Sequence, residues 1–587
     1  MKPEKTKPWN QFRKINLKAI DKKSKKAEAA SMRHAHKFLV SRIENLRHIR
    51  RHLVAWLVLL MMLISLNALQ IVFNQSYTSS LQPVENGAYA EGVLGPVNNL
   101  NPLFASTDAE LSASKLLFSS LLSYDQSGRL QNEVAKSIET KDNGKSYTVN
   151  IHDNIKWHDG EPMTAEDIAF TVKTMQDPVA NANQFSSWQG IQVTVDNPYQ
   201  LTFVLPATYA PFPSALTFPI VPQHVLGKVA PATLQENNFN DNPIGSGPFK
   251  YIDLQTIDAN REKNALQLVR NDSYWKTKPH LARFSLYVYS SKQDIAQALK
   301  QREINAANGV KVDESGIESS DIALNNGVYA LLRTDGQILL DKQVRKALVQ
   351  SLDRDALRKK LQVTKSLDSP IVNNLTPQTN QIMQTSYDFQ VATQTLATAG
   401  WVKNKDGILE KAGIPLELRL VAVDTENYKK ITSALVQQWK KLGIKLQVQL
   451  IDPEQIQQVI LRPRAYDILV YELSMGGDPD GYAFWHSSQV SSSGLNFSNY
   501  NSPAADDALL TARGRSAMAQ RDAKYVTFAR KWVDDVPAIA LYRSSLQYST
   551  TKGTYALGGV DVLVSPADRY YNVADWAAET TPTYNTP

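Results

Sequence analysis

The 587-residue sequence contains no cysteine. This absence excludes disulfide bridges, thiolate metal ligands, a cysteine nucleophile and an N-terminal cysteine that carries a lipid. It indicates nothing about the redox compartment, because a chain without thiols is indifferent to it. Hydrophobic residues make up 43% of the chain and charged residues 21%, which is typical of a folded globular protein and excludes a disordered or collagen-like one.

Motifs for common chemistry are missing as well. The sequence has neither the G-x-S-x-G motif of a nucleophile elbow nor the H-E-x-x-H motif of a zinc site. Gly144-Lys145-Ser146 resembles the end of a phosphate-binding loop, but Glu139 stands where that motif requires its first glycine. The histidines beyond residue 52 show no ligand spacing. The sequence therefore predicts no catalytic residue, no metal site and no cofactor, and we expect that the protein is not an enzyme.

Positive charge is concentrated at one end of the chain. The first 52 residues contain 16 Lys and Arg against 4 Asp and Glu, and the remaining 535 contain 48 against 53. The body is therefore mildly acidic. Because a nucleic-acid-binding body needs a basic face to neutralise phosphates, we expect no nucleic-acid partner.

A membrane segment follows the basic tail. Residues 53–73 carry no charge, and as a helix they would span about 30 Å, the thickness of a bilayer core. Arg47, Arg50 and Arg51 precede them, and the next basic residue is Lys115. The positive-inside rule therefore predicts a single-pass protein of the cell membrane, with its N-terminus in the cytoplasm and its body outside, periplasmic or at the cell surface. A buried core helix is the alternative.

The same segment differs from a cleaved signal peptide. Its basic region and its apolar stretch are both longer than those of a signal peptide, and the best small-x-small triplet, Ala88-Tyr89-Ala90, lies too far downstream. We therefore predict a basic cytoplasmic tail at 1–52, an uncleaved transmembrane anchor at 53–73 in the lipid bilayer, and a linker at 74–90. The apolar residues before the anchor have helical spacing: Leu39, Ile43, Leu46, Ile49 and Leu53.

From Glu91 onward, short strands and helical stretches alternate without a fixed repeat, which predicts a mixed α/β body. Thr164 and Asp167 have the spacing of a capping box at the start of a helix, and Asn143-Gly144 is a hairpin turn signal. Strands are predicted at 146–151, 191–205 (two strands around a turn), 444–451 and 539–542. Further helices are predicted at 340–360, 427–442 and 520–534.

Six motifs, in order along the chain, resemble those of the family 5 extracellular solute-binding proteins, the peptide- and nickel-binding receptors of ABC importers. The fullest is WHDGEPMTAEDIAF at residues 157–170. The other five are LNP at 100–102, GSGPF at 245–249, RNDSYW at 270–275, VRKALVQSLDR at 344–354 and GDP at 477–479. One such match would be weak, but six in order are specific.

The resemblance implies a two-lobed α/β fold of the periplasmic-binding-protein type II, in its large three-domain form, preceded here by one transmembrane helix. The solute-binding domain would occupy residues 91–577. Lobe I would comprise 91–115, 235–330 and 540–577, with an insert at 116–234, and lobe II would comprise 331–539. Such a receptor captures a peptide or similar small solute between its lobes and delivers it to the permease subunits of an ABC importer.

The resemblance also places candidate ligand-binding residues. Peptide-binding members carry an Asp just before the D-P loop that grips the ammonium group of the ligand, but here the matching residue is Met475. Another family carboxylate is replaced by Ser106. Asp478 is the remaining carboxylate near the loop, and a turn role is its alternative. The whole predicted ligand-binding set is Ser106, Thr107, Trp188, Tyr471, Met475, Gly476, Gly477, Asp478 and Trp485.

Two other classes of protein remain as alternatives. One is a DNA-binding regulator with a fused solute-sensing domain, although residues 1–52 are short for a DNA reader. The other is an exported enzyme or an adhesive surface protein on the same scaffold, because fold alone does not fix function. The sequence identifies neither the ligand nor the permease.

Overall fold

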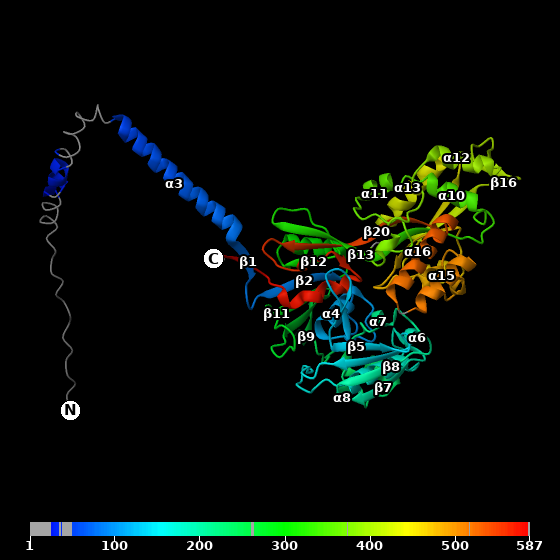
Figure 1. Ribbon diagram of the computed structural model, residues 1–587, viewed down its shortest axis with the longest axis horizontal. Helices are drawn as coiled ribbons and strands as arrows, with labels where there is room; N and C mark the ends of the chain where they lie inside the picture. Colours follow the sequence, from blue (N-terminus) through cyan, green and yellow to red (C-terminus); the bar gives the residue numbers. More distant parts are fainter. Residues whose placement is uncertain are drawn as a thin grey trace. The chain divides into compact units, whose positions relative to one another are not determined.

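The computed structural model describes residues 25–26, 28–34, 37, 50–259, 263–372, 374–515 and 517–584. The chain forms two compact units, one of residues 1–82 and 582–587 and the other of residues 83–581. Their elements are labelled in Figure 1.

The first unit contains one long apolar helix, α3 (Arg50–Thr78). Its segment His52–Val72, of 21 residues with a hydropathy of 2.2, is long and apolar enough to cross a membrane. This segment agrees within one residue at each end with the predicted span. The helix continues beyond it to Thr78, and strand β1 (Ser79–Pro83) follows and pairs with β22 (Thr580–Tyr584), where the sequence suggested a linker. The apolar stripe predicted between residues 39 and 49, and most of the basic tail, lie outside the described residues.

The second unit is built on one sheet of 11 strands. Its order is β18-β17-β19-β13-β20-β12-β2-β11-β10-β9, with β21 paired to β13. The strands are β18 (Lys445–Ile451), β17 (Glu417–Val423), β19 (Ile468–Ser474), β13 (Ile317–Leu332), β20 (Ala538–Thr551), β12 (Ala306–Asn308), β2 (Ala88–Leu94), β11 (Arg283–Tyr289), β10 (Lys263–Arg270), β9 (Phe249–Asp258) and β21 (Val562–Leu563).

Two long strands of this sheet, β13 and β20, run antiparallel and connect separate hydrophobic cores. Their residues near 322–324 and 546–548 belong to a core that includes β2 and β11, whereas residues 328–332 and 538–542 belong to two other cores. We call the part around the first core lobe I and the part around the other two lobe II. The register of β13 with β20 shifts between Ala323 and Gly327, where the strands pass from one lobe to the other.

The predicted insert contains a four-stranded antiparallel sheet in the order β5-β6-β8-β7. Its strands are β5 (Ala135–Lys141), β6 (Ser146–Ile151), β8 (Gln200–Val204) and β7 (Gln192–Asn197). The hairpin turn at Asn143-Gly144 is confirmed, because both residues have positive φ between β5 and β6. Buried residues of this sheet, such as Val149 and Phe203, belong to the same hydrophobic cluster as β2 and β11. The insert therefore shares its core with lobe I.

The longest family motif ties the insert to lobe I. The capping box of Thr164 and Asp167 is confirmed at the start of α5 (Ala165–Gln176). His158 Nδ1 accepts a hydrogen bond from the Gly245 N–H, and its Nε2 lies 3.1 Å from the Gly247 carbonyl oxygen. Burial lowers the pKa of His158 to about 4, so the ring is neutral at physiological pH. The motif thus joins the turn at Gly245 to the insert.

The sequence predicted part of the helical cover of lobe II. The helix at 427–442 is confirmed as α13 (Glu426–Leu442), and it ends at Gly443 with a φ of 98°. The stretch 340–360 forms two helices, α10 (Lys342–Gln350) and α11 (Arg354–Leu361), because the Asp353 side chain caps the second. The other helices of this lobe are α12 (Phe389–Thr398), α14 (Tyr482–Trp485), α15 (Pro503–Arg513) and α16 (Met518–Asp535).

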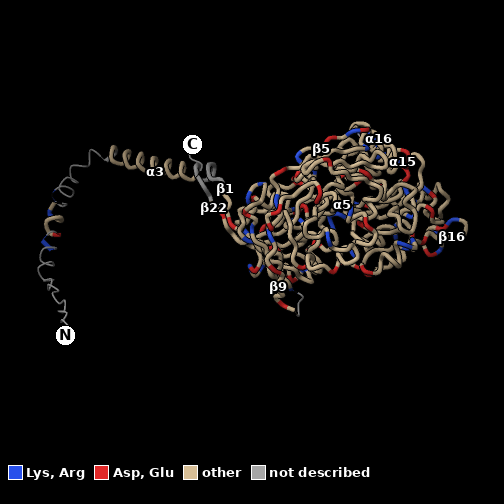
Figure 2. Tube along the Cα trace, turned by 90° about the horizontal axis from the view of Figure 1, so that it is seen from below, with Lys and Arg blue, Asp and Glu red and all other residues tan. Residues whose placement is uncertain are grey.

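The remaining elements of lobe I and the insert are short. They are α4 (Asp108–Leu117), β3 (Leu122–Tyr124), β4 (Leu130–Asn132), α6 (Phe185–Trp188), α7 (Phe212–Ala215), α8 (Gln223–Leu226), η3 (Pro231–Glu236), η4 (Asn238–Asn240), α9 (Lys292–Lys300) and η9 (Pro566–Asp575). Figure 2 shows acidic and basic residues interspersed along the second unit, as its near-balanced charge predicts.

Candidate ligand-binding site

A loop after β19 carries most of the predicted ligand-binding residues of lobe II. The Met475 N–H donates to the Asn325 carbonyl over 2.8 Å, and Asn325 Nδ2 donates to the Gly476 carbonyl over 2.9 Å. Asn325 is fully buried on β13, at the crossing between the lobes. Gly476 has a φ of 68°, which glycine adopts without steric cost. The crossing strand therefore holds this loop in place through two hydrogen bonds.

Gly477 brings the loop against Tyr124 of β3, in the insert that shares its core with lobe I. A Cβ atom on Gly477 would lie 2.5 Å from Cζ of Tyr124, which is far closer than van der Waals contact. Burial raises the pKa of Tyr124 to about 12, so its hydroxyl group is neutral at physiological pH. The two lobes therefore meet at a glycine that leaves room for the tyrosine ring.

A second contact joins the insert to lobe II through Arg513, the last residue of α15. The Arg513 carbonyl accepts a hydrogen bond of 2.9 Å from the Ala210 N–H. Its guanidinium group lies 5.1 Å from the centre of the Tyr209 ring and 3.9 Å from that of Tyr482. It also pairs with Asp480 over 2.8 Å. Burial raises the pKa of Asp480, while Arg513 acts in the opposite direction. Arg513 thus connects the D-P loop to the insert.

A pocket of about 340 Å³ lies in lobe I beside this junction. Tyr124 lines it and also contacts Gly477, so the pocket adjoins the loop of lobe II. Its wall combines apolar side chains with two amides, a composition that is common in ligand sites. Lining residues include Leu103, Leu111, Tyr124, Asn183, Gln184 and Val564.

A neighbouring pocket of about 320 Å³ shares three lining residues with the first. These are Tyr124 and the ion pair of Lys115 with Asp568, whose atoms lie 2.8 Å apart. Burial would lower the pKa of Lys115, but the Asp568 carboxylate outweighs it and the pKa is raised. The ion pair therefore forms part of the wall of both pockets.

Ser106 and Thr107 lie at the start of α4, directly after Ala105 of the pocket wall. The Thr107 side chain accepts the Glu110 N–H, and the Glu110 carboxylate accepts the N–H groups of Ser106 and Thr107. This reciprocal pattern is a capping box. Both residues therefore fix the entry of α4, whose Leu111 and Ser114 line the pocket.

The two predicted tryptophans are fully buried. The Trp188 ring packs 5.0 Å from that of Phe218, and its Nε1 donates to Gln184 Oε1 over 3.1 Å. Trp188 does not line the pocket itself, but it contacts Gln184, which does. Trp485 packs 5.4 Å from Trp532 in a core of lobe II.

Asp478 is already paired with a buried arginine. Its Oδ1 accepts the Arg521 Nη2 over 2.6 Å and the Asp480 N–H over 3.0 Å. The second bond is the turn role that the sequence offered as an alternative. Burial would lower the pKa of Arg521, but Asp478 outweighs it and the pKa is raised. Tyr471 is half-buried on β19, with its ring 5.7 Å from Phe497.

The sequence did not reveal the partners of the loop. Tyr124, Arg513 and Arg521 belong to distant segments and follow no motif, so only the fold brings them to the loop. A signal existed for Asn325, because Asn325-Asn326-Gly327 interrupts an otherwise strand-like run.

Two lobes joined by crossing strands, with a pocket beside their contact, define the class of two-lobed binding proteins. The sequence model described as "Bacterial extracellular solute-binding proteins, family 5 Middle" matches residues 129–495. The chain belongs to this family, as its motifs predicted. The predictions of the fold and of a solute-binding receptor are confirmed.

Individual relatives agree with this assignment. The oligopeptide-binding protein AppA of Bacillus subtilis is 29% identical over 483 residues, which cover 79% of this chain and 87% of AppA. The structure of AppA in complex with a nonapeptide matches with a TM-score of 0.68 and 26% identity, over 84% of this chain and 99% of AppA. NikZ of Campylobacter jejuni, solved with Ni(L-His), has the same fold, with a TM-score of 0.69 at 23% identity, over 84% and 99% of the two chains.

Proposed function

We propose that this protein is a membrane-anchored receptor that captures peptides between its lobes and delivers them to an ABC importer. The observation that carries the proposal is the position of Tyr124, which lines the lobe I pocket and contacts the loop of lobe II. A solute in this pocket would touch both lobes and favour the arrangement in which they meet. The capture is non-covalent, with the solute released unchanged.

In this proposal the loop of Met475, Gly476, Gly477 and Asp478 forms the lobe II wall, with Tyr471 beside it. Ser106 and Thr107 are at the opposite edge of the pocket, and Trp188 and Trp485 support the walls from behind. Asn183 Nδ2 donates to the Ala105 carbonyl and Gln184 Oε1 accepts from Trp188, so the Asn183 oxygen would accept from a peptide backbone and the Gln184 nitrogen would donate to it. The apolar side chains around them suit ligand side chains of several kinds.

The proposed topology places α3 across the membrane with the N-terminus in the cytoplasm. Its support is the charge pattern, with Arg50 and Arg51 at the cytoplasmic end of the helix and no basic residue after it before Lys115. An anchored receptor remains close to its permease, which raises the effective concentration of the pair.

The test uses the full chain purified in detergent micelles. Small molecules that co-purify are identified by mass spectrometry, and a pool of random pentapeptides is then titrated while the thermal unfolding midpoint is followed. We expect bound peptides and a midpoint that rises with peptide concentration. Co-purification of a nickel chelate, with no response to peptides, would replace peptides by metal chelates as the ligand class. Chemical change in any added peptide would contradict the proposed non-covalent role.

A further inference from the structure

Arg543 is a buried cation at the crossing between the lobes. It lies on β20 and is 8% exposed. Its Nε donates to the Leu324 carbonyl over 2.6 Å, and its Nη2 donates to Asn325 Oδ1 and Asn374 Oδ1, each over 2.7 Å. All three acceptors are neutral.

No carboxylate neutralises this guanidinium group within the part of the chain that the structure describes. Burial lowers the pKa of Arg543 to about 10, and no acidic side chain counteracts this effect. The group is still protonated at neutral pH. A buried charge without a counter-charge is costly, so such a group is a candidate for binding an anion.

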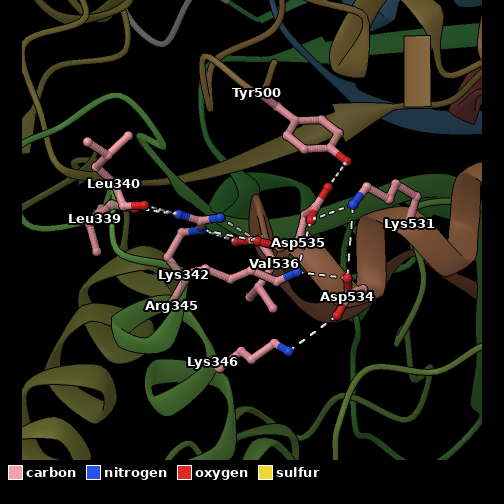
Figure 3. A network of polar contacts seen from close by, with 10 residues as sticks. All are labelled: Leu339, Leu340, Lys342, Arg345, Lys346, Tyr500, Lys531, Asp534, Asp535 and Val536. Atoms are coloured by element: carbon pink, nitrogen blue, oxygen red, sulfur yellow. Dashed lines mark hydrogen bonds and ion pairs between the residues drawn. The ribbon is translucent and has the colours of Figure 1, made fainter. Parts of the chain in front are cut away.

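The other buried arginines differ from Arg543. Arg345 of lobe II also donates to backbone carbonyls (Figure 3). However, burial lowers the pKa of Arg345 and the negative charge of Asp535 opposes this effect. Arg464 has no ion pair either, but its Nε and Nη1 are sealed from solvent. Four more buried arginines form ion pairs: Arg354 and Arg358 with Asp368, Arg521 with Asp478, and Arg569 with Glu91.

One nitrogen of Arg543 remains available. Its Nη1 has no hydrogen-bond partner among the described residues, and it is not among the buried polar atoms that are cut off from solvent. Guanidinium groups bind carboxylates through such N–H groups.

The surroundings of Arg543 belong to the candidate site. Asn325, which accepts from its Nη2, donates to the Gly476 carbonyl of the loop. A Cβ atom on Gly128 would lie 3.6 Å from Val564 and 3.8 Å from Asn374 Nδ2, so Asn374 is close to a residue that lines the 340 Å³ pocket. Arg543 is thus one side chain away from the loop through Asn325, and its second partner Asn374 lies near Gly128, as the pocket residue Val564 does.

We propose that Arg543 binds a carboxylate group of the captured solute at the crossing of the two lobes. The inference rests on the proposed function and adds the chemical group by which the solute is recognised. A peptide carries such a group at its C-terminus and on acidic side chains. Because Arg543 lies where the strands pass between the lobes, the bound carboxylate would neutralise the positive charge that is buried at this crossing.

The experiment compares pools of random pentapeptides on the full chain in detergent micelles. One pool has free C-termini, a second is amidated, and a third is amidated and made without Asp and Glu. We expect the wild type to bind the first pool at least about tenfold more tightly than the third. The second pool separates the two sources of the carboxylate, because tight binding to it identifies an acidic side chain. Equal affinity for the first and third pools overturns the proposal.

Two variants connect this preference to Arg543. Arg543→Gln keeps hydrogen-bonding capacity without charge. This variant should bind all three pools with the affinity that the wild type has for the third pool. Asn374→Asp keeps Arg543 but places a carboxylate where the amide oxygen lies 2.7 Å from Nη2. It should raise the unfolding midpoint and abolish the preference. Arg345→Gln is the matched control, and its preference should equal that of the wild type. A wild-type preference in Asn374→Asp overturns the proposal even if Arg543→Gln does not fold.

If no pool binds, peptide capture fails and propionate then tests Arg543 alone. Under the inference, propionate raises the unfolding midpoint of the wild type but not that of Arg543→Gln or Asn374→Asp. An equal effect on all three proteins overturns it.

Discussion

Replacing Gly477 by alanine tests whether the contact with Tyr124 is part of lobe closure. The added Cβ would lie 2.5 Å from Tyr124 Cζ, whereas carbon atoms in contact are about 3.5–4.0 Å apart. Gly477 is not among the glycines with positive φ, so alanine suits its backbone. The strain therefore arises only when the lobes meet.

The size of the effect follows from the overlap. Relieving an overlap of this size requires a shift of about 1 Å in the ring or the lobes, and overpacking of a well-packed contact costs about 1–3 kcal/mol. This free energy is subtracted from closure, so peptide affinity should fall by about 5- to 150-fold. The unfolding midpoint of the empty protein should change little, because its lobes can separate.

The assay combines peptide titration with solution scattering of the full chain. Gly514→Ala is the matched control, because a Cβ there meets its nearest atom at 3.6 Å and φ is −86°. Combining Gly477→Ala with Tyr124→Phe should leave the defect, since Cζ remains. Combining it with Tyr124→Ala should remove the defect relative to Tyr124→Ala alone. Wild-type affinity in Gly477→Ala, or equal defects in the two double variants, would refute the reasoning.

Three further predictions concern pH, charge and topology. Burial holds the pKa of His158 in the folded protein at about 4, so the unfolded chain binds a proton first as the pH falls below about 6.5. Up to about 3 kcal/mol of folding stability should therefore be lost by pH 4. His158→Gln should show a smaller acid-induced fall in the unfolding midpoint than the wild type, and an equal fall would contradict this. Asp478→Asn should lower the unfolding midpoint through the loss of about 3 kcal/mol of folding stability, because it leaves the Arg521 side chain, which is 4% exposed, without its ion-pair partner. In a separate test on the wild type, equal affinity for N-acetylated and free peptides would show that no ammonium pocket exists. Protease added to intact cells should remove the body and leave a membrane stub, whereas protection until lysis would contradict the topology.

Local sequence rules predicted the elements that depend on neighbouring residues. The capping box at Thr164, the turn at Asn143-Gly144 and the end of α13 at Gly443 each depend on a few adjacent side chains. The break between α10 and α11 was missed, although Asp353 is a recognisable N-cap, because the apolar spacing continues across it. The helical period alone cannot detect a change of direction in the chain.

The candidate site could be predicted only in part for the same reason. The GDP motif at 477–479 located the loop, in which Gly476 has a positive φ and Gly477 leaves room for the Tyr124 ring. The buried position of Trp188 and the pairing of Asp478 with Arg521 depend on segments far away in sequence. No periodicity encodes such contacts, so the ion pair of the loop could not be predicted without the fold.

The two crossing strands also determine which part of the chain could be deleted without disturbing the rest. The chain leaves lobe I along β13, builds the whole of lobe II and returns along β20, which is the antiparallel neighbour of β13. Lobe II is thus, topologically, an enlarged hairpin loop. Ala323 and Ser545 are paired across this hairpin, so a short turn could join the two strands near them and delete lobe II without rerouting the rest of the chain.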